Sequence, residues 1–67
     1  MTIYILNVDH IYKILTRDEI IPNFYQLLVD YPLSQYRYEL TAYKLVGQHL
    51  QAKSKINLNN LISSIDI

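Results

Sequence analysis

The sequence predicts a small all-α domain of three or four helices, with a short N-terminal strand as the alternative for its first residues. Apolar residues recur at helical spacing over most of the chain. Two prolines and several capping residues divide the chain into segments of helix length. A chain of 67 residues is long enough for only one domain. We therefore expect residues 1–67 to form a single small helical domain.

The first residues fit two kinds of element. Thr2–Leu6 is a β-branched and aromatic run that alternates weakly, as a short strand does. Ile3, Leu6 and Ile14 also fit a period of 3.6 residues, as the first turns of a helix would. Both interpretations of this segment stay open.

Two helices are predicted in the first half of the chain. The first runs from Asn7 or Asp9, which can cap it, to about Arg17. The second begins at Asp18, and Pro22 fits its first turn, where the missing amide has no partner to lose. Pro32 ends it. Its apolar stripe consists of Ile20, Phe24, Leu27 and Tyr31.

The longest predicted helix covers residues 34–53 and begins at Ser34 as its cap. Stepping at about 100° per residue places apolar groups on two nearly opposite seams. One seam contains Tyr36, Leu40, Tyr43, Gly47 and Leu50, and the other contains Tyr38, Ala42, Leu45, His49 and Ala52. A monomer's surface helix needs only one apolar stripe. This helix is therefore either sandwiched between the shorter helices or in contact with a second chain.

A last short helix is predicted after Asn57, which can cap it. Its apolar face consists of Leu58, Leu61, Ile62 and Ile65.

The sequence offers little for chemistry. Cysteine is absent, which excludes disulfides and thiolate metal sites, and a single glycine excludes a glycine-rich phosphate loop. His10 and His49 have no metal-ligand spacing. We therefore expect no catalytic residue, no metal and no cofactor, and we expect that the protein is not an enzyme.

No apolar run approaches the roughly 20 residues that a membrane span needs. The first residues lack the basic region and long apolar core of a signal peptide. We expect a cytoplasmic protein without a membrane partner.

Seven tyrosines in so short a chain indicate a binding surface, because tyrosine is enriched at protein interfaces. We therefore predict a protein-interaction module, that is, an adaptor, inhibitor or accessory subunit that binds through a tyrosine-rich apolar helix face. Its partner would be another protein or itself, in a homodimer or a larger complex. The predicted anchors are Tyr36, Tyr38, Tyr43 and Leu45, extended by Tyr25 and Tyr31.

The alternative is a small dimeric helix-turn-helix regulator that binds nucleic acid. Two predicted helices joined by a tight turn at residues 30–34 have that arrangement. A polar strip able to reach phosphates or bases would contain Arg37, Thr41, Lys44, Gln48 and Gln51. The net charge is zero, which ranks nucleic acid below protein as the partner.

Overall fold

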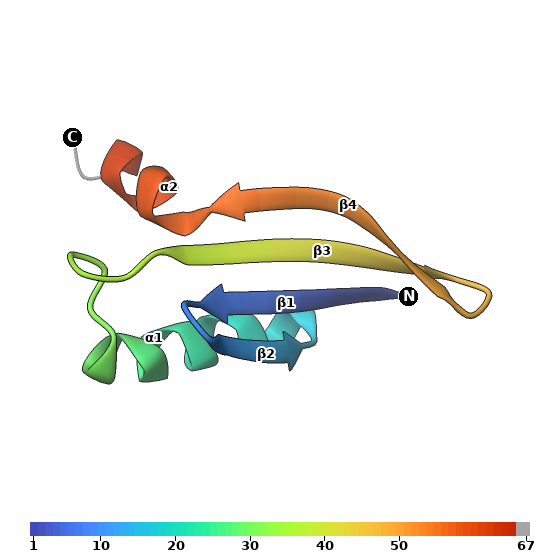
Figure 1. Ribbon diagram of the computed structural model, residues 1–67, viewed down its shortest axis with the longest axis horizontal. Coiled ribbons are helices and arrows are strands. Elements are labelled where there is room, and N and C mark those ends of the chain that lie inside the picture. The colour runs from blue at the N-terminus through green and yellow to red at the C-terminus, as the bar shows by residue number, and fades with distance from the viewer. Residues whose placement is uncertain (66–67) are drawn as a thin grey trace.

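The computed structural model describes the backbone of residues 1–65 and the side chains of residues 1–61. Its elements are β1 (Thr2–Val8), β2 (Ile11–Leu15), α1 (Ile20–Asp30), β3 (Tyr38–Val46), β4 (His49–Asn57) and α2 (Leu58–Ile65), with a single 3₁₀ turn at Arg17–Glu19 before α1. The strands form one antiparallel sheet in the order β2-β1-β3-β4 (Figure 1). The prediction of an all-α domain, and of a helix bundle, is therefore wrong.

The predicted helix from Asn7 or Asp9 to Arg17 is also wrong, because this segment forms a β-hairpin with the first residues. Val8 pairs with Ile11, which leaves Asp9 and His10 as a two-residue turn. Asp9 has a φ of 52°, and the Asn7 side-chain amide donates to the carbonyls of Asp9 at 3.0 Å and Ile11 at 3.1 Å. The strand interpretation of the N-terminal residues is confirmed, and β2 supplies the second strand that it needs.

The predicted helix over residues 34–53 is wrong for a similar reason. Val46 pairs with His49, so Gly47 and Gln48 form a two-residue turn between two strands of nine residues each. Gly47 has a φ of 63° while Gln48 keeps an ordinary negative φ, which is the pattern of a type II′ hairpin turn. The hairpin extends beyond the other two strands (Figure 1). Without a helix here, the helix-turn-helix interpretation also fails.

The two remaining helix predictions are confirmed. The carboxylate of Glu19 accepts hydrogen bonds from the backbone amide and the hydroxyl of Thr16, both at 2.9 Å, and this pair caps the 3₁₀ turn that precedes α1. The cap residue of α1 itself is Glu19, one residue after the predicted Asp18. Pro22 is the third residue of α1, and the helix ends at Asp30, before Pro32. At α2, the side-chain oxygen of Asn57 accepts from the amide of Asn60 at 3.3 Å, as a cap does.

The apolar face predicted for the last helix is only partly described. Leu58 packs against the core, and Leu61 is exposed. The side chains of Ile62 and Ile65 lie outside the described residues. No helix within residues 1–65 has the length and apolar character needed to cross a bilayer.

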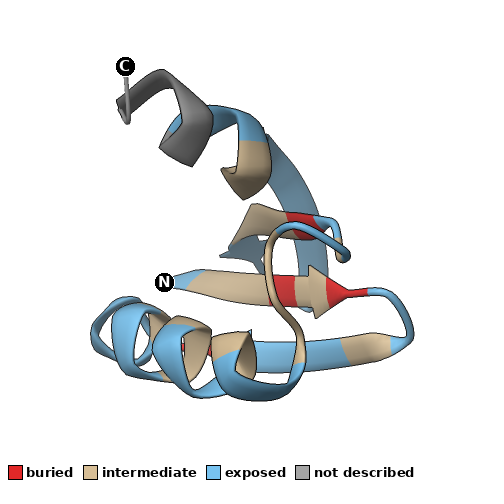
Figure 2. Ribbon diagram, turned by 90° about the vertical axis from the view of Figure 1, so that its left-hand side faces the viewer, coloured by how far each residue is buried: buried red, intermediate tan, exposed pale blue. Residues whose placement is uncertain are grey.

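The core lies between the sheet and α1. Leu6, Val8, Leu15 and Tyr38 are buried, and Figure 2 shows most of the buried positions on the central strands β1 and β3. The ring of Phe24 meets that of Tyr38 edge to face, with centroids 5.3 Å apart. The partly buried residues around this core are Ile20, Phe24, Leu27, Leu28, Tyr31, Leu33, Tyr36, Leu40 and Leu58. The stripe predicted for α1 is thus the face that packs on the sheet.

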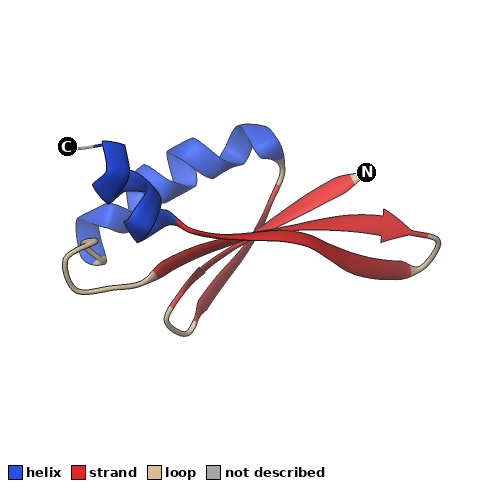
Figure 3. Ribbon diagram, turned by 90° about the horizontal axis from the view of Figure 1, so that it is seen from above, coloured by secondary structure: helices blue, strands red, loops and turns tan. Residues whose placement is uncertain are grey.

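Both helices lie on the same side of the sheet (Figure 3). The opposite side carries no helix among the described residues. One face of the sheet therefore builds the core, and none of the described helices covers the other.

Candidate functional site

The side of the sheet away from α1 and α2 is here called the helix-free face. Its apolar members come from all four strands: Ile3 and Ile5 of β1, Tyr12 and Ile14 of β2, Tyr43 and Leu45 of β3, and Leu50 of β4. At one end of the face lie the polar side chains of Asn7, Glu39, Thr41 and Lys55.

Strand register brings these residues to one side. Ile5 lies between Ile14 on β2 and Thr41 on β3, and Thr41 pairs in turn with Lys55. Residues that pair directly across antiparallel strands lie on the same face. Ile3 pairs with Tyr43, and Leu45 pairs with Leu50, which extends the apolar surface along the projecting hairpin.

This surface is unusually apolar for one that faces water. Ile14 is 73% exposed and Tyr12 69% exposed, while Ile3 and Ile5 are only half-buried. An antiparallel strand with one face in water normally alternates apolar and polar residues, whereas a strand covered on both sides is apolar throughout. In β1, Leu6 and Val8 face the core and Ile3 and Ile5 face away from it. Strand β1 therefore has the composition of a strand that is covered on both faces.

The polar end of the face holds an ion pair whose opposite charges cancel. The Lys55 ammonium lies 2.8 Å from the Glu39 carboxylate. The hydrogen bond from Lys55 lowers the pKa of Glu39, and the Lys55 and Arg37 charges lower it further against the effect of burial. The same hydrogen bond raises the pKa of Lys55. Both groups are therefore charged at neutral pH. They border a shallow depression of about 210 Å³ lined by Ile5, Asn7, Tyr12, Glu39, Thr41, Tyr43 and Lys55.

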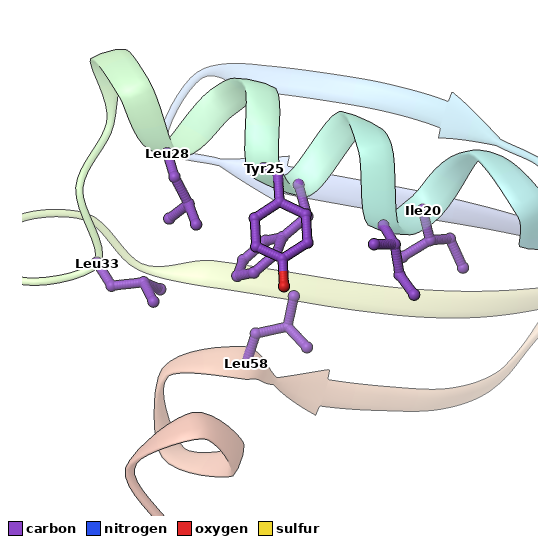
Figure 4. A pocket seen from close by; sticks show the side chains of 7 residues that line it. Ile20, Tyr25, Leu28, Leu33 and Leu58 are labelled. Atoms are coloured by element: carbon purple, nitrogen blue, oxygen red, sulfur yellow. The ribbon is translucent and has the colours of Figure 1, made fainter. Parts of the chain in front are cut away.

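A second apolar surface lies on the helix side. It is a groove of about 550 Å³ between α1 and the first turn of α2, lined by Ile20, Ile21, Phe24, Tyr25, Leu28, Leu33 and Leu58. Figure 4 shows Ile20, Tyr25 and Leu28 pointing from α1 towards Leu33 and Leu58. The groove lacks charged side chains among these residues. It continues the protein's own core, because Leu28, Leu33 and Leu58 also pack against the buried cluster.

The predicted anchors are divided among different surroundings. Tyr43 and Leu45 lie on the helix-free face, Tyr25 lies in the groove, and Tyr38 is fully buried. The Tyr38 hydroxyl donates to the carbonyl of Tyr31, and burial raises the pKa of that hydroxyl. Tyr31 and Tyr36 meet edge to face with ring centroids 5.1 Å apart beside the core. Tyr43 and Leu45 are thus the predicted anchors that the structure places together on an open surface.

The polar strip predicted for nucleic acid is not a single strip in the structure. Lys44 and Gln51 are a cross-strand pair on the helix side of the hairpin, and Thr41 lies on the helix-free face. Gln48 is in the hairpin turn, and Arg37 precedes β3.

The metal-ligating side chains in the described part of the chain are not gathered into a cluster. His10 is in the β1–β2 turn and His49 begins β4, so the two histidines lie at opposite ends of the sheet. Residues 1–65 contain no group of three or more histidine, aspartate and glutamate side chains placed to hold a metal ion.

Comparison with protein-family models, curated proteins and solved structures gave no significant match.

Sequence reasoning missed five apolar members of the helix-free face, namely Ile3, Ile5, Tyr12, Ile14 and Leu50. The signal that indicates Ile3 and Ile5 is the apolar character of Thr2–Val8 at both odd and even positions. Read as a strand, such a segment has two apolar faces and needs a cover on each.

Proposed function

We propose that this chain is a protein-interaction module, and that its helix-free face is the binding surface. The observation that carries this proposal is the open apolar surface formed by Ile3, Ile5, Ile14 and Tyr43 on the side of the sheet opposite the core. Contiguous exposed apolar surface with a polar rim is typical of protein-binding sites. The sequence-based interpretation of a binding protein is kept, but the surface is a sheet face in place of a helix face.

Binding without catalysis is the role that the residues support. The polar groups on the face are Thr41, Asn7, whose amide donates to carbonyls of the β1–β2 turn, and the Glu39–Lys55 pair, whose opposite charges meet each other. These groups suit the rim of a protein interface. A cytoplasmic location stays a prediction from the sequence.

The test is site-specific photo-crosslinking in the native host. A photoreactive phenylalanine derivative replaces Tyr12 on the helix-free face or, as the control, Val29 on α1, which is 82% exposed. We expect protein adducts from position 12 and none from position 29. Equal labelling from both positions, or none from either, would contradict a binding role for this face.

A further inference from the structure

We propose that a second copy of this chain covers the helix-free face with its own helix-free face, so that two sheets pack together in a symmetric dimer. This inference rests on the proposed function and names its partner. Three observations support it: the amount of surface that the chain exposes, the charge of the helix-free face and the shape of the molecule.

The exposed surface exceeds that of an ordinary monomer by the area of one interface. The accessible surface of the chain is 5211 Å². A folded monomer of 7.9 kDa is expected to expose about 4,400 Å², so the surplus is about 800 Å². A standard stable interface buries about 800 Å² on each partner. The chain therefore has enough extra surface for one such interface.

The shape of the molecule accounts for this surplus. Its radius of gyration is 12.5 Å and its longest extent is 40 Å. A compact chain of this length has a radius of gyration of about 11 Å. The projecting β3–β4 hairpin lengthens the sheet, and Leu45 and Leu50 carry the apolar surface onto it.

The face is compatible with a copy of itself. Its ion pair between Glu39 and Lys55 has no net charge, so two copies meet without like-charge repulsion. A two-fold axis through the apolar part, near Ile3 and Tyr43, would place the ion pair of each copy at opposite edges of the interface. The charged groups would then stay in water as the rim, while the apolar residues lose their exposure.

Known sheet geometry accommodates this arrangement. Two twisted antiparallel sheets pack face to face about 10 Å apart, with strand directions about 30° from each other. Two-fold dimers that use one surface patch from both subunits are the commonest closed assemblies. Since α1 lies on the far side of each sheet, the dimer would have the layer order helix, sheet, sheet, helix.

The first test measures whether the face becomes hidden as concentration rises. The natural chain has no cysteine, so Ile14→Cys and Val29→Cys each provide a single thiol, one on the face and one on α1. We expect alkylation of the thiol at position 14 to slow by about tenfold or more between roughly 1 μM and 1 mM protein, as dimerisation proceeds. The thiol at position 29 should react equally at both concentrations. Equal, concentration-independent labelling at position 14 would overturn the proposal.

The second test measures mass. Sedimentation equilibrium of the full chain should give twice the mass of one chain at high concentration. Ile14→Glu should raise the dimer dissociation constant by about tenfold or more, whereas Val29→Glu should leave it unchanged. Circular dichroism of both variants checks that they stay folded. A single-chain mass at all concentrations, or a dimer insensitive to Ile14→Glu, would overturn the proposal.

The two proposals fail separately. Sedimentation could give the mass of a single chain while the adducts from position 12 have a mass other than that of two copies. This result would contradict the self-association proposal and leave the binding role intact. Absence of face-specific adducts in cells would contradict the binding role itself.

Discussion

The side-chain oxygen of Asn59 accepts a hydrogen bond from the backbone amide of Tyr38 at 2.7 Å. The side-chain nitrogen of the same residue donates to the carbonyls of Leu33 at 3.0 Å and Tyr36 at 2.8 Å. One carboxamide in the first turn of α2 therefore holds the loop that leads into β3. This loop also carries Leu33 and Tyr36 against the core.

Asn59→Ala should lower the free energy of unfolding by about 1–3 kcal/mol, because it leaves three partly buried backbone groups without a partner. Chemical denaturation measures the change. Gln26→Ala, which removes an exposed amide from α1, should change stability by no more than about 0.5 kcal/mol. Equal effects from the two variants would show that the Asn59 contacts contribute nothing.

Gly47→Ala should lower the free energy of unfolding by about 1–2 kcal/mol, because the left-handed φ of 63° strains any residue with a Cβ. No heavy atom lies within 4 Å of the position that the Cβ would occupy, so the cost comes from the backbone alone. Thermal unfolding provides the measurement. Gln48→Ala in the same turn has no such strain and should be nearly neutral.

Asp9 has the same backbone requirement in the β1–β2 turn, and its φ of 52° is one that aspartate tolerates better than most residues. Asp9→Val should therefore cost about 1–2 kcal/mol of stability, since a β-branched residue is poorly accommodated there. The neighbouring His10→Val should cost clearly less. If both variants unfold at the same temperature, the turn is not strained in the way described.

Glu39 should make stability depend on pH. Because its folded-state pKa lies below the ordinary 4.5, the unfolded chain binds the proton more tightly. The contribution is therefore fully present above about pH 4.5 and is lost as the pH falls through the lowered pKa. Carboxyl NMR titration should show that Lys55→Ala raises the Glu39 pKa more than Arg37→Ala does, since the hydrogen bond from Lys55 is the largest cause of the shift. Equal shifts from the two variants would contradict that assignment.

The helices of this protein could be predicted from sequence because their signals are local. In α1, the stripe from Ile20 to Tyr31 and the stop at Pro32 depend only on neighbouring residues. The same holds for Asn57 at the start of α2.

The strands could not be predicted in the same way, because a strand is stabilised by partners far along the chain. Val8 lies beside Tyr38, and Ile3 beside Tyr43. On a helical projection, residues 34–53 showed two nearly opposite apolar seams, a pattern that also arises when apolar residues alternate. Tyr38, Leu40 and Ala42 do alternate, and they face the helix side of the sheet. Gly47, the single glycine, lies in the hairpin turn, although the helical projection placed it on one of the two seams.

The candidate surface was predicted in part. Tyr43 and Leu45 were identified from residue type, and they lie on the open face. Tyr38 has the same side chain and is fully buried. Residue type alone does not distinguish the two faces of a strand, since that depends on which side α1 covers.

Strand β4 forms one of the two edges of the sheet, and its pairing with β3 is irregular where Ala42 opposes Ser54 and Tyr43 opposes Ala52. Lys53 is thus an extra residue, and it places a bulge and a charge midway along the edge. Bulges and lysines on an edge strand hinder the regular addition of further strands, which is the first step towards amyloid fibres. Addition of a further strand is therefore hindered at the β4 edge of the sheet, so this edge contributes little to polymerisation.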